Sequence, residues 1–279
     1  EEQACSDHMM LVRKIDSFDD PKLAPYRTMR DQAEHREQHI FVAEGEKLVR
    51  RLLECQFTVI SVLMPEKWLA ELRPLLEART EEVDVFLADK QLLEQLTGYS
   101  MYQGLLAVGK VPLLHSLDQV ITGSPSPRLL VAVDTLANAE NLGALIRNCG
   151  AFNVHGLLVG ETSCSPYLRR AVRSSMGAIF HLPVVETASL VGCLRELKRR
   201  GIRCIAAHPH VEGKTLSQCN LATDCCIVFG SEGHGISPSV LKVCDDAVAI
   251  PMPPQVDSLN VGSAAAVFLY EANRQRGKM

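Results

Sequence analysis

Polar side chains that could hold a substrate lie where apolar stretches end in the second half of the chain. Asn141, Gly143 and Arg147 form the pattern N-x-G-A-x-x-R after the apolar run 129–134. An arginine guanidinium can bind a phosphate through two parallel hydrogen bonds, and an asparagine can cap the free N–H groups of a helix start. Taken alone, a plain helix cap and a solvated arginine are the simpler interpretation. The chemistry therefore depends on what other segments supply.

A glycine-rich turn follows the apolar run 225–230. Gly230, Gly233 and Gly235 surround Glu232, and glycine permits a close approach of the backbone to a ligand. The spacing is G-x-x-G-x-G, whereas the dinucleotide-binding pattern is G-x-G-x-x-G on a first strand–helix turn. A dinucleotide-dependent oxidoreductase is therefore a weak alternative.

The third group lies where a short apolar segment leads into a long apolar helix. Ile250 and Met252 end the segment, and Ser258 and Asn260 begin the helix. These two side chains can cap the helix, and the same groups can hold a ligand. The sequence contains no C-x-x-C pair, and no other spacing suggests a metal, so we expect a site without one.

In order, spacing and residue identity, the three groups resemble the three motifs of the SpoU-type RNA ribose methyltransferases, the TrmH-like branch of the SPOUT superfamily. The resemblance implies methyl transfer from S-adenosylmethionine to a ribose 2′-hydroxyl in structured RNA, ribosomal RNA more than transfer RNA. It also implies an α/β SPOUT domain with a trefoil knot and a mostly parallel sheet. The family is dimeric, which implies a homodimer with its sites near the subunit interface.

The resemblance assigns roles to named residues. The reaction site comprises Asn141, Arg147, Glu232, Ser258 and Asn260. The cofactor contacts are Gly230, Gly235, Ile250, Met252 and Leu259. For Arg147 we expect phosphate binding and orientation, because a guanidinium stays protonated in proteins and is poorly suited to remove a proton. Orientation of bound reactants suffices for much of a methyl transfer.

Two positions depart from the family pattern. Pro254 stands where many relatives have glycine, and Gly262 stands where they have serine. Proline stiffens a loop. We therefore expect these two departures to affect how well the cofactor fits its site.

The alternation of apolar and helical segments predicts two domains. We expect an RNA-binding α/β domain over 1–112, a linker over 113–127 and the methyltransferase domain over 128–279. The expected strands cover 58–64, 83–88, 104–111, 129–134, 154–160, 202–208, 225–230 and 247–250, and the expected helices include 44–56, 66–78 and one through Leu142, Leu145, Ile146 and Cys149. Strands separated by helices indicate a mostly parallel sheet covered on both faces. Segments 36–54 and 97–110 resemble the family's substrate-binding domain.

Composition agrees with a globular protein that works in the cytoplasm. Apolar residues make up 47% and charged residues 22% of the 279 residues, and no apolar run is long enough to span a bilayer. The ten cysteines are expected to be free thiols. Residues 1–12 resemble neither a signal peptide nor an element of the fold.

A net charge of −4 means that RNA contacts must come from a local basic patch. Arg169, Arg170 and Arg173 are the expected contacts. The alternative from another class is a non-catalytic RNA-binding or assembly protein that retains the fold. A cofactor-binding assay separates the methyltransferase from this alternative, because a protein that only binds RNA need not bind S-adenosylmethionine.

Overall fold

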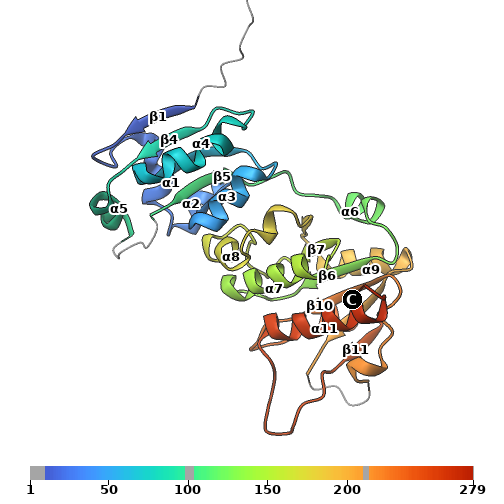
Figure 1. The fold of residues 1–279 in the computed structure, drawn as a ribbon. Coiled ribbons are helices and arrows are strands. Elements are labelled where there is room, and N and C mark those ends of the chain that lie inside the picture. Colours follow the sequence, from blue (N-terminus) through green and yellow to red (C-terminus); the bar gives the residue numbers. More distant parts are fainter. Residues whose placement is uncertain (1–9, 98–103, 210–213, 279) are drawn as a thin grey trace, which may run out of the picture. The chain divides into compact units, whose positions relative to one another are not determined.

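Two separate β-sheets organise the chain in the computed structural model (Figure 1), which describes residues 10–97, 104–209 and 214–278. The first compact unit combines Glu1–Pro112 with Tyr167–Phe180, and the second combines Leu113–Pro166 with His181–Met279. The chain therefore leaves the second unit once, between Pro166 and His181, and contributes a segment to the first.

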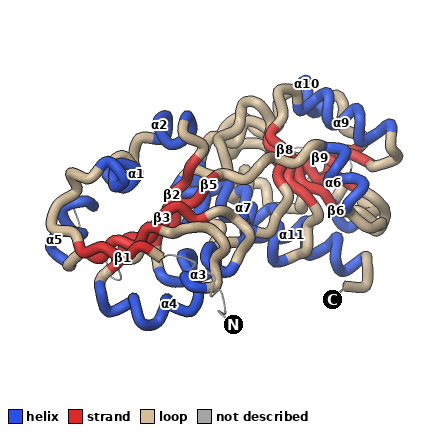
Figure 2. The backbone as a smooth tube through the Cα atoms, turned by 90° about the horizontal axis from the view of Figure 1, so that it is seen from above, coloured by secondary structure: helices blue, strands red, loops and turns tan. Residues whose placement is uncertain are grey.

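The first unit contains a mixed five-stranded sheet in the order β1-β4-β3-β5-β2. Its strands are β1 (Leu11–Lys14), β2 (Ile40–Glu44), β3 (Val59–Met64), β4 (Asp84–Leu87) and β5 (Leu106–Lys110). Its helices are α1 (Ala24–Arg27), α2 (Gln32–Glu37), α3 (Glu46–Glu54), α4 (Leu69–Glu77), α5 (Lys90–Thr97) and α8 (Arg169–Ser174). Figure 2 shows α1, α2 and α5 on one face of this sheet and α3 and α4 on the other.

The second unit contains a six-stranded sheet in the order β11-β9-β10-β6-β7-β8, and all its strand pairs are parallel. Its strands are β6 (Leu129–Val133), β7 (Gly156–Val159), β8 (Val184–Glu186), β9 (Arg203–Ala207), β10 (Cys225–Phe229) and β11 (Asp246–Val248). Its helices are α6 (Leu117–Gly123), α7 (Ala139–Ala151), α9 (Leu190–Arg199), α10 (Pro238–Leu241) and α11 (Val261–Gln275). The expected α/β fold with a mostly parallel sheet is confirmed.

Apolar side chains on both faces of the second sheet explain why helices pack against each face. Leu130 and Ala132 of β6 pack with Leu194 of α9 in one core. On the opposite face the ring of Phe229 meets that of Phe268 of α11 edge-on, with centroids 5.7 Å apart. Successive residues of a strand point to opposite faces, so a fully apolar strand needs a layer on each side.

The strands expected from the sequence are all present, within a few residues at their ends. β1, β2 and β8 were not expected as strands, and Leu11 and Val12 of β1 lie in the segment that was given no structural role. Segment 97–110, which resembles the substrate-binding domain, lies partly outside the described residues.

The expected linker over 113–127 is not an unstructured connection, which corrects the prediction. Ser116 and Gln119 form a capping box at the start of α6, and Val120 and Ile121 are buried in a core of the second unit. A cluster rich in Gly, Ser and Pro, residues 123–127, is typical of a linker, and it begins only where this helix ends.

The segment Tyr167–Phe180 packs within the first unit through aromatic rings. The Phe41 ring lies 6.0 Å from that of Tyr167 and 5.9 Å from that of Phe180. Phe57 contacts the Phe180 ring edge-on at 5.6 Å. The expected boundary at residue 128 therefore leaves out a segment that the first unit needs for its core.

Candidate functional site

The turn after β10 has a shape that depends on glycine. Ser231 and Gly235 exchange two backbone hydrogen bonds of 3.1 and 2.9 Å, and Gly235 has a φ of 66°. A Cβ atom on Gly230 would lie 2.1 Å from the carbonyl carbon of Gly235. The turn thus folds back on itself so closely that a side chain at position 230 would overlap its backbone.

Two residues at the end of β6 hold this turn in place. The hydroxyl of Thr135 donates to the carbonyl oxygen of Gly235 at 3.0 Å. The buried carboxylate of Asp134 accepts from the N–H of Ser237 at 2.7 Å. Neither residue was expected at the site from the sequence, where the one signal was an aspartate directly after a buried strand.

Asn260 joins the three polar groups that the sequence predicted as one site. Its side chain caps α11, because Oδ1 accepts from the N–H of Gly262 at 2.9 Å. Its Nδ2 donates to Oδ1 of Asn141 at 3.0 Å and to Oε1 of Glu232 at 2.5 Å. One residue of each group therefore meets at the start of α11.

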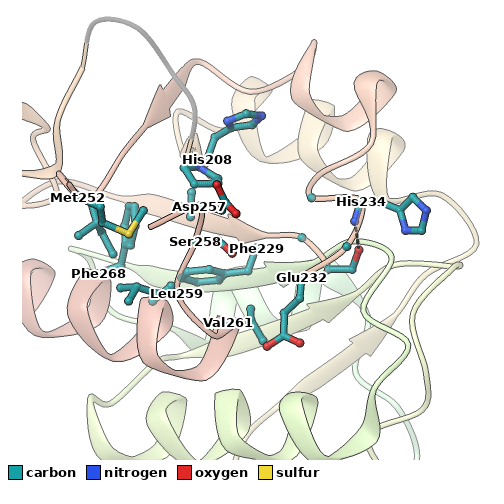
Figure 3. Close-up of a pocket in the computed structure, with 18 of the residues that line it drawn as sticks. His208, Phe229, Glu232, His234, Met252, Asp257, Ser258, Leu259, Val261 and Phe268 are labelled. Atoms are coloured by element: carbon teal, nitrogen blue, oxygen red, sulfur yellow. Dashed lines mark hydrogen bonds between the residues drawn. The ribbon is translucent and has the colours of Figure 1, made fainter. Parts of the chain in front are cut away.

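A cavity of about 380 Å³ opens beside this junction, entirely within the second unit. Its wall comprises Ala207, His208, Pro209, Phe229, Gly230, Ser231, Glu232, Gly233, His234, Gly235, Val248, Ile250, Met252, Asp257, Ser258, Leu259, Val261, Ala264 and Phe268. Figure 3 shows how the labelled side chains surround it. The size suits a small organic ligand.

The resemblance assigns residues of two separate segments, 230–235 and 250–260, to one site, and residues of both segments line this cavity. All five residues expected to contact the cofactor are in its wall, as are two of those expected at the reaction site, Glu232 and Ser258. Asn141 and Asn260 lie just behind Glu232 through their hydrogen bonds.

The charges in the cavity wall favour a cationic ligand. Glu232 and Asp257 supply two carboxylates, and among the described residues no lysine or arginine lines the cavity. A dinucleotide would bring a pyrophosphate, which proteins hold with cations or with free helix N-termini, whereas the side chain of Asn260 already caps the start of α11 at this wall. The remaining wall is largely apolar, with Phe229, Leu259 and Phe268 in it.

Arg147 lies apart from this junction. It is exposed on α7, and in the part of the chain that the structure describes its side chain makes no hydrogen bond or ion pair. It follows Asn141 by six residues, which corresponds to roughly 120° around the helix and about 9 Å along it. As expected, it points away from the apolar face of its helix.

Asn138 caps α7, whereas Asn141 was the cap that we expected from the sequence. The Oδ1 atom of Asn138 accepts from the backbone N–H groups of Glu140 and Asn141, at 2.9 and 3.0 Å. The side chain of Asn141 is thus left to accept from Asn260.

Both departures from the family pattern fit their surroundings. The N–H of Val256 donates to the carbonyl oxygen of Pro253 at 3.0 Å, so Pro254 occupies the second position of a turn, where proline is favoured. A Cβ atom on Gly262 would lie 3.1 Å from the Cβ of Ala144, so glycine lets α11 approach α7. Neither residue is in the cavity wall.

Comparison with known proteins identifies the family. A family model described as the SpoU rRNA Methylase family matches residues 128–270. The chain belongs to this family. An uncharacterised tRNA/rRNA methyltransferase of Mycobacterium tuberculosis is 30% identical over 98% of this chain and 96% of its own length.

Solved structures of family members match the fold of nearly the whole chain. The SpoU methyltransferase AviRb from Streptomyces viridochromogenes, solved in complex with the cofactor AdoMet, is 25% identical with a TM-score of 0.78, over 91% of this chain and 97% of its own. An RNA 2′-O ribose methyltransferase is 28% identical with a TM-score of 0.75, over 96% and 99%. The likeness covers the first unit as well as the methylase region.

The three arginines expected to contact RNA lie in the segment that belongs to the first unit. Arg169 and Arg173 both pair with the carboxylate of Glu44, which is 9% exposed. Arg170 is exposed and makes no hydrogen bond or ion pair with the described residues. Arg169 is thus occupied within the protein, whereas Arg170 and the largely exposed Arg173 face solvent.

No nucleophilic or metal-binding group competes with this site among residues 10–97, 104–209 and 214–278. The nine cysteines described there are free, and burial raises the pKa of Cys204 to about 12 and of Cys225 to about 11. The same residues contain no group of three side chains placed to bind a metal, and none of their helices is long and apolar enough to cross a membrane.

Proposed function

We propose that the chain transfers a methyl group from S-adenosylmethionine to a ribose 2′-hydroxyl of structured RNA, ribosomal RNA more than transfer RNA. One observation carries the proposal: Asn260 joins all three motifs beside a cavity whose wall has two carboxylates and no lysine or arginine among the described residues. Membership of the SpoU rRNA Methylase family supports the reaction class.

S-adenosylmethionine is the cofactor that this cavity fits. It supplies an electrophilic methyl group when bound. The glycine turn offers backbone atoms at close range, and the apolar wall around Phe229 and Leu259 suits a base or ribose face. The relative AviRb has been solved with this cofactor.

The residues at the junction act mainly by orientation. Asn260 fixes the carboxamide of Asn141 and the carboxylate of Glu232 in one geometry, and Ser258 adds a hydroxyl at the cavity wall. Arg147 is free to bind the phosphate next to the reacting ribose. Fixing the attacking oxygen in line with the methyl group can lower the barrier by roughly 7–11 kcal/mol at best.

RNA binding is assigned to the first unit together with Arg170 and Arg173. Neither guanidinium is buried, so both can contact phosphate. Exchange of Arg170 for alanine should weaken RNA binding for all sequences alike and lower the salt dependence by about one counterion. Arg169→Ala should instead reduce thermal stability, because Glu44 would lose its closest partner.

A homodimer is part of the proposal. The outer side of α11 exposes Val267 and Tyr270, which are large apolar side chains one turn apart. Such residues suit an interface between two copies. Light scattering after size exclusion tests this, and a monomer at micromolar concentration would contradict it.

Two measurements decide between catalysis and plain RNA binding. Calorimetry should detect S-adenosylmethionine and give no signal with nicotinamide dinucleotides. Mass spectrometry of nucleosides from RNA treated with the protein should reveal a 2′-O-methylated ribose. Cofactor binding without methylation of any cellular RNA would favour the non-catalytic alternative, and dinucleotide binding would overturn the assignment.

A further inference from the structure

One carboxylate in the cavity wall has no partner within the described residues. Asp257 lines the cavity next to Ser258, and no hydrogen bond or ion pair engages its side chain there. Glu232, the other carboxylate, is already bound by Asn260. Figure 3 shows the two carboxylates apart, with the Phe229 ring drawn between them. Asp257 is therefore the acidic group that remains available to a ligand.

We propose that Asp257 binds the positive charge of the cofactor, with the α-ammonium group as its partner. This inference rests on the proposed function and adds a residue to it. S-adenosylmethionine carries two positive charges, the sulfonium and the ammonium. No described lysine or arginine of the wall competes for Asp257. A carboxylate that accepts hydrogen bonds from an ammonium forms a strong, charge-assisted contact.

The contact has a selective consequence. Nucleotides that fill the apolar part of the cavity with an adenosine would still place an anionic phosphate toward Asp257, which repels it. An adenosyl ligand whose amino-acid end carries an ammonium, beside its carboxylate, gains from the same group. Among the described residues the wall has no lysine or arginine to hold a phosphate, and Asp257 adds a repulsive charge. Both features favour S-adenosylmethionine over nucleotides.

Three ligands separate the charges of the cofactor. S-adenosylmethionine has the sulfonium and the ammonium, S-adenosylhomocysteine keeps only the ammonium, and 5′-methylthioadenosine has neither. Calorimetry with the full-length protein should show that Asp257→Asn weakens the first two by roughly tenfold or more and shifts the third by no more than about twofold. Asp257→Glu, which retains the charge, should recover part of the lost affinity.

Asp118→Asn provides a matched control, because it removes a carboxylate of α6 that does not line the cavity. It should leave all three affinities unchanged. A loss for S-adenosylmethionine alone would place Asp257 beside the sulfonium and overturn its assignment to the ammonium. Equal losses for all three ligands, or none in Asp257→Asn, would overturn it.

Failure of this inference is distinct from failure of the proposed function. If the wild-type protein does not bind S-adenosylmethionine, the cofactor assignment is wrong whatever Asp257 does. If the wild type binds and Asp257→Asn binds equally well, only the role of Asp257 is wrong. Thermal unfolding of each variant shows whether a lost affinity reflects a lost fold.

Discussion

Gly230 offers the sharpest test of how the cavity is built. In Gly230→Ala the new Cβ would lie 2.1 Å from the carbonyl carbon of Gly235, 2.2 Å from its oxygen and 2.4 Å from the nitrogen of Ile236. Carbon atoms in contact are separated by about 3.5–4.0 Å, so the turn must move by roughly 1 Å or more. These neighbours are backbone atoms, so no side-chain rotation can relieve the overlap.

The size of the effect follows from that displacement. A misplacement of about 1 Å in a reacting geometry costs on the order of 100-fold in rate, so Gly230→Ala should lose methylation by about that factor. Its affinity for S-adenosylmethionine should also fall, because the displaced turn is part of the cavity wall. Overpacking costs typically about 1–3 kcal/mol in the free energy of unfolding, which should leave the protein folded at room temperature.

Gly123→Ala is the matched control. Gly123 ends α6, outside the cavity wall, where a Cβ would meet nothing within 4 Å and the φ is not positive. Calorimetry, a methylation assay and thermal unfolding should therefore separate the two variants clearly. Wild-type affinity in Gly230→Ala, or an equal loss in Gly123→Ala, would refute the argument that close backbone packing shapes this wall.

Three further predictions concern the rest of the chain. Arg147→Ala should keep the fold and the affinity for the cofactor yet lose at least about 100-fold in methylation rate. Arg147→Lys should restore little of that rate, because an ammonium lacks the planar fork of a guanidinium. Near-normal turnover of either variant would rule out this role of Arg147. Asn260→Asp should keep the cap on α11 but lose methylation, because it has no donor for Glu232 and Asn141. It should also lower the melting temperature, because it sets a second carboxylate beside Glu232. Asn260→Ala should lose methylation and, with the cap, about 1 kcal/mol of stability, and equal rates in both variants and the wild type would contradict the network. Removal of residues 1–112 should preserve binding of S-adenosylmethionine, because the whole cavity lies in the second unit. RNA affinity should fall, and a hydrophobic dye should bind to Tyr167 and Phe180, which lose the rings that they pack against. Unchanged RNA affinity would show that the first unit does not bind the substrate.

Strands were the most predictable elements because a parallel sheet with helices on both faces needs apolar residues at every position. β6 and β10 are buried along their whole length, and each was evident as a continuous apolar run. β8 has only three residues, too few for such a run to stand out. β1 reads Leu-Val-Arg-Lys, with one half-buried residue and three exposed ones, so it shows neither a long apolar run nor a buried face.

The sequence predicted which residues belong to the site better than it predicted which of them contact one another. Asn138 and Asn141 are both asparagines near one helix start, and only coordinates show which one caps it. The pairing of Arg169 with Glu44 joins positions 125 residues apart, and no local pattern predicts such a contact. A cluster of three arginines therefore suggested one shared role, whereas the structure separates Arg169 from the other two.

The order of the second sheet explains why the three motifs converge. From β6 the chain proceeds outward to β7 and β8, and it then crosses to β9 on the other side, so that β10 inserts between β9 and β6. Ligands of open parallel sheets bind outside the carboxyl ends of the strands where the order reverses. The cavity wall takes residues from the ends of β9, β10 and β11, and the end of β6 supplies the residues that fasten the glycine turn. The strand order brings the three motifs to one edge of the sheet, and the hydrogen bonds of Asn260, Thr135 and Asp134 then fix them there. The motif residues therefore form a site only in this fold.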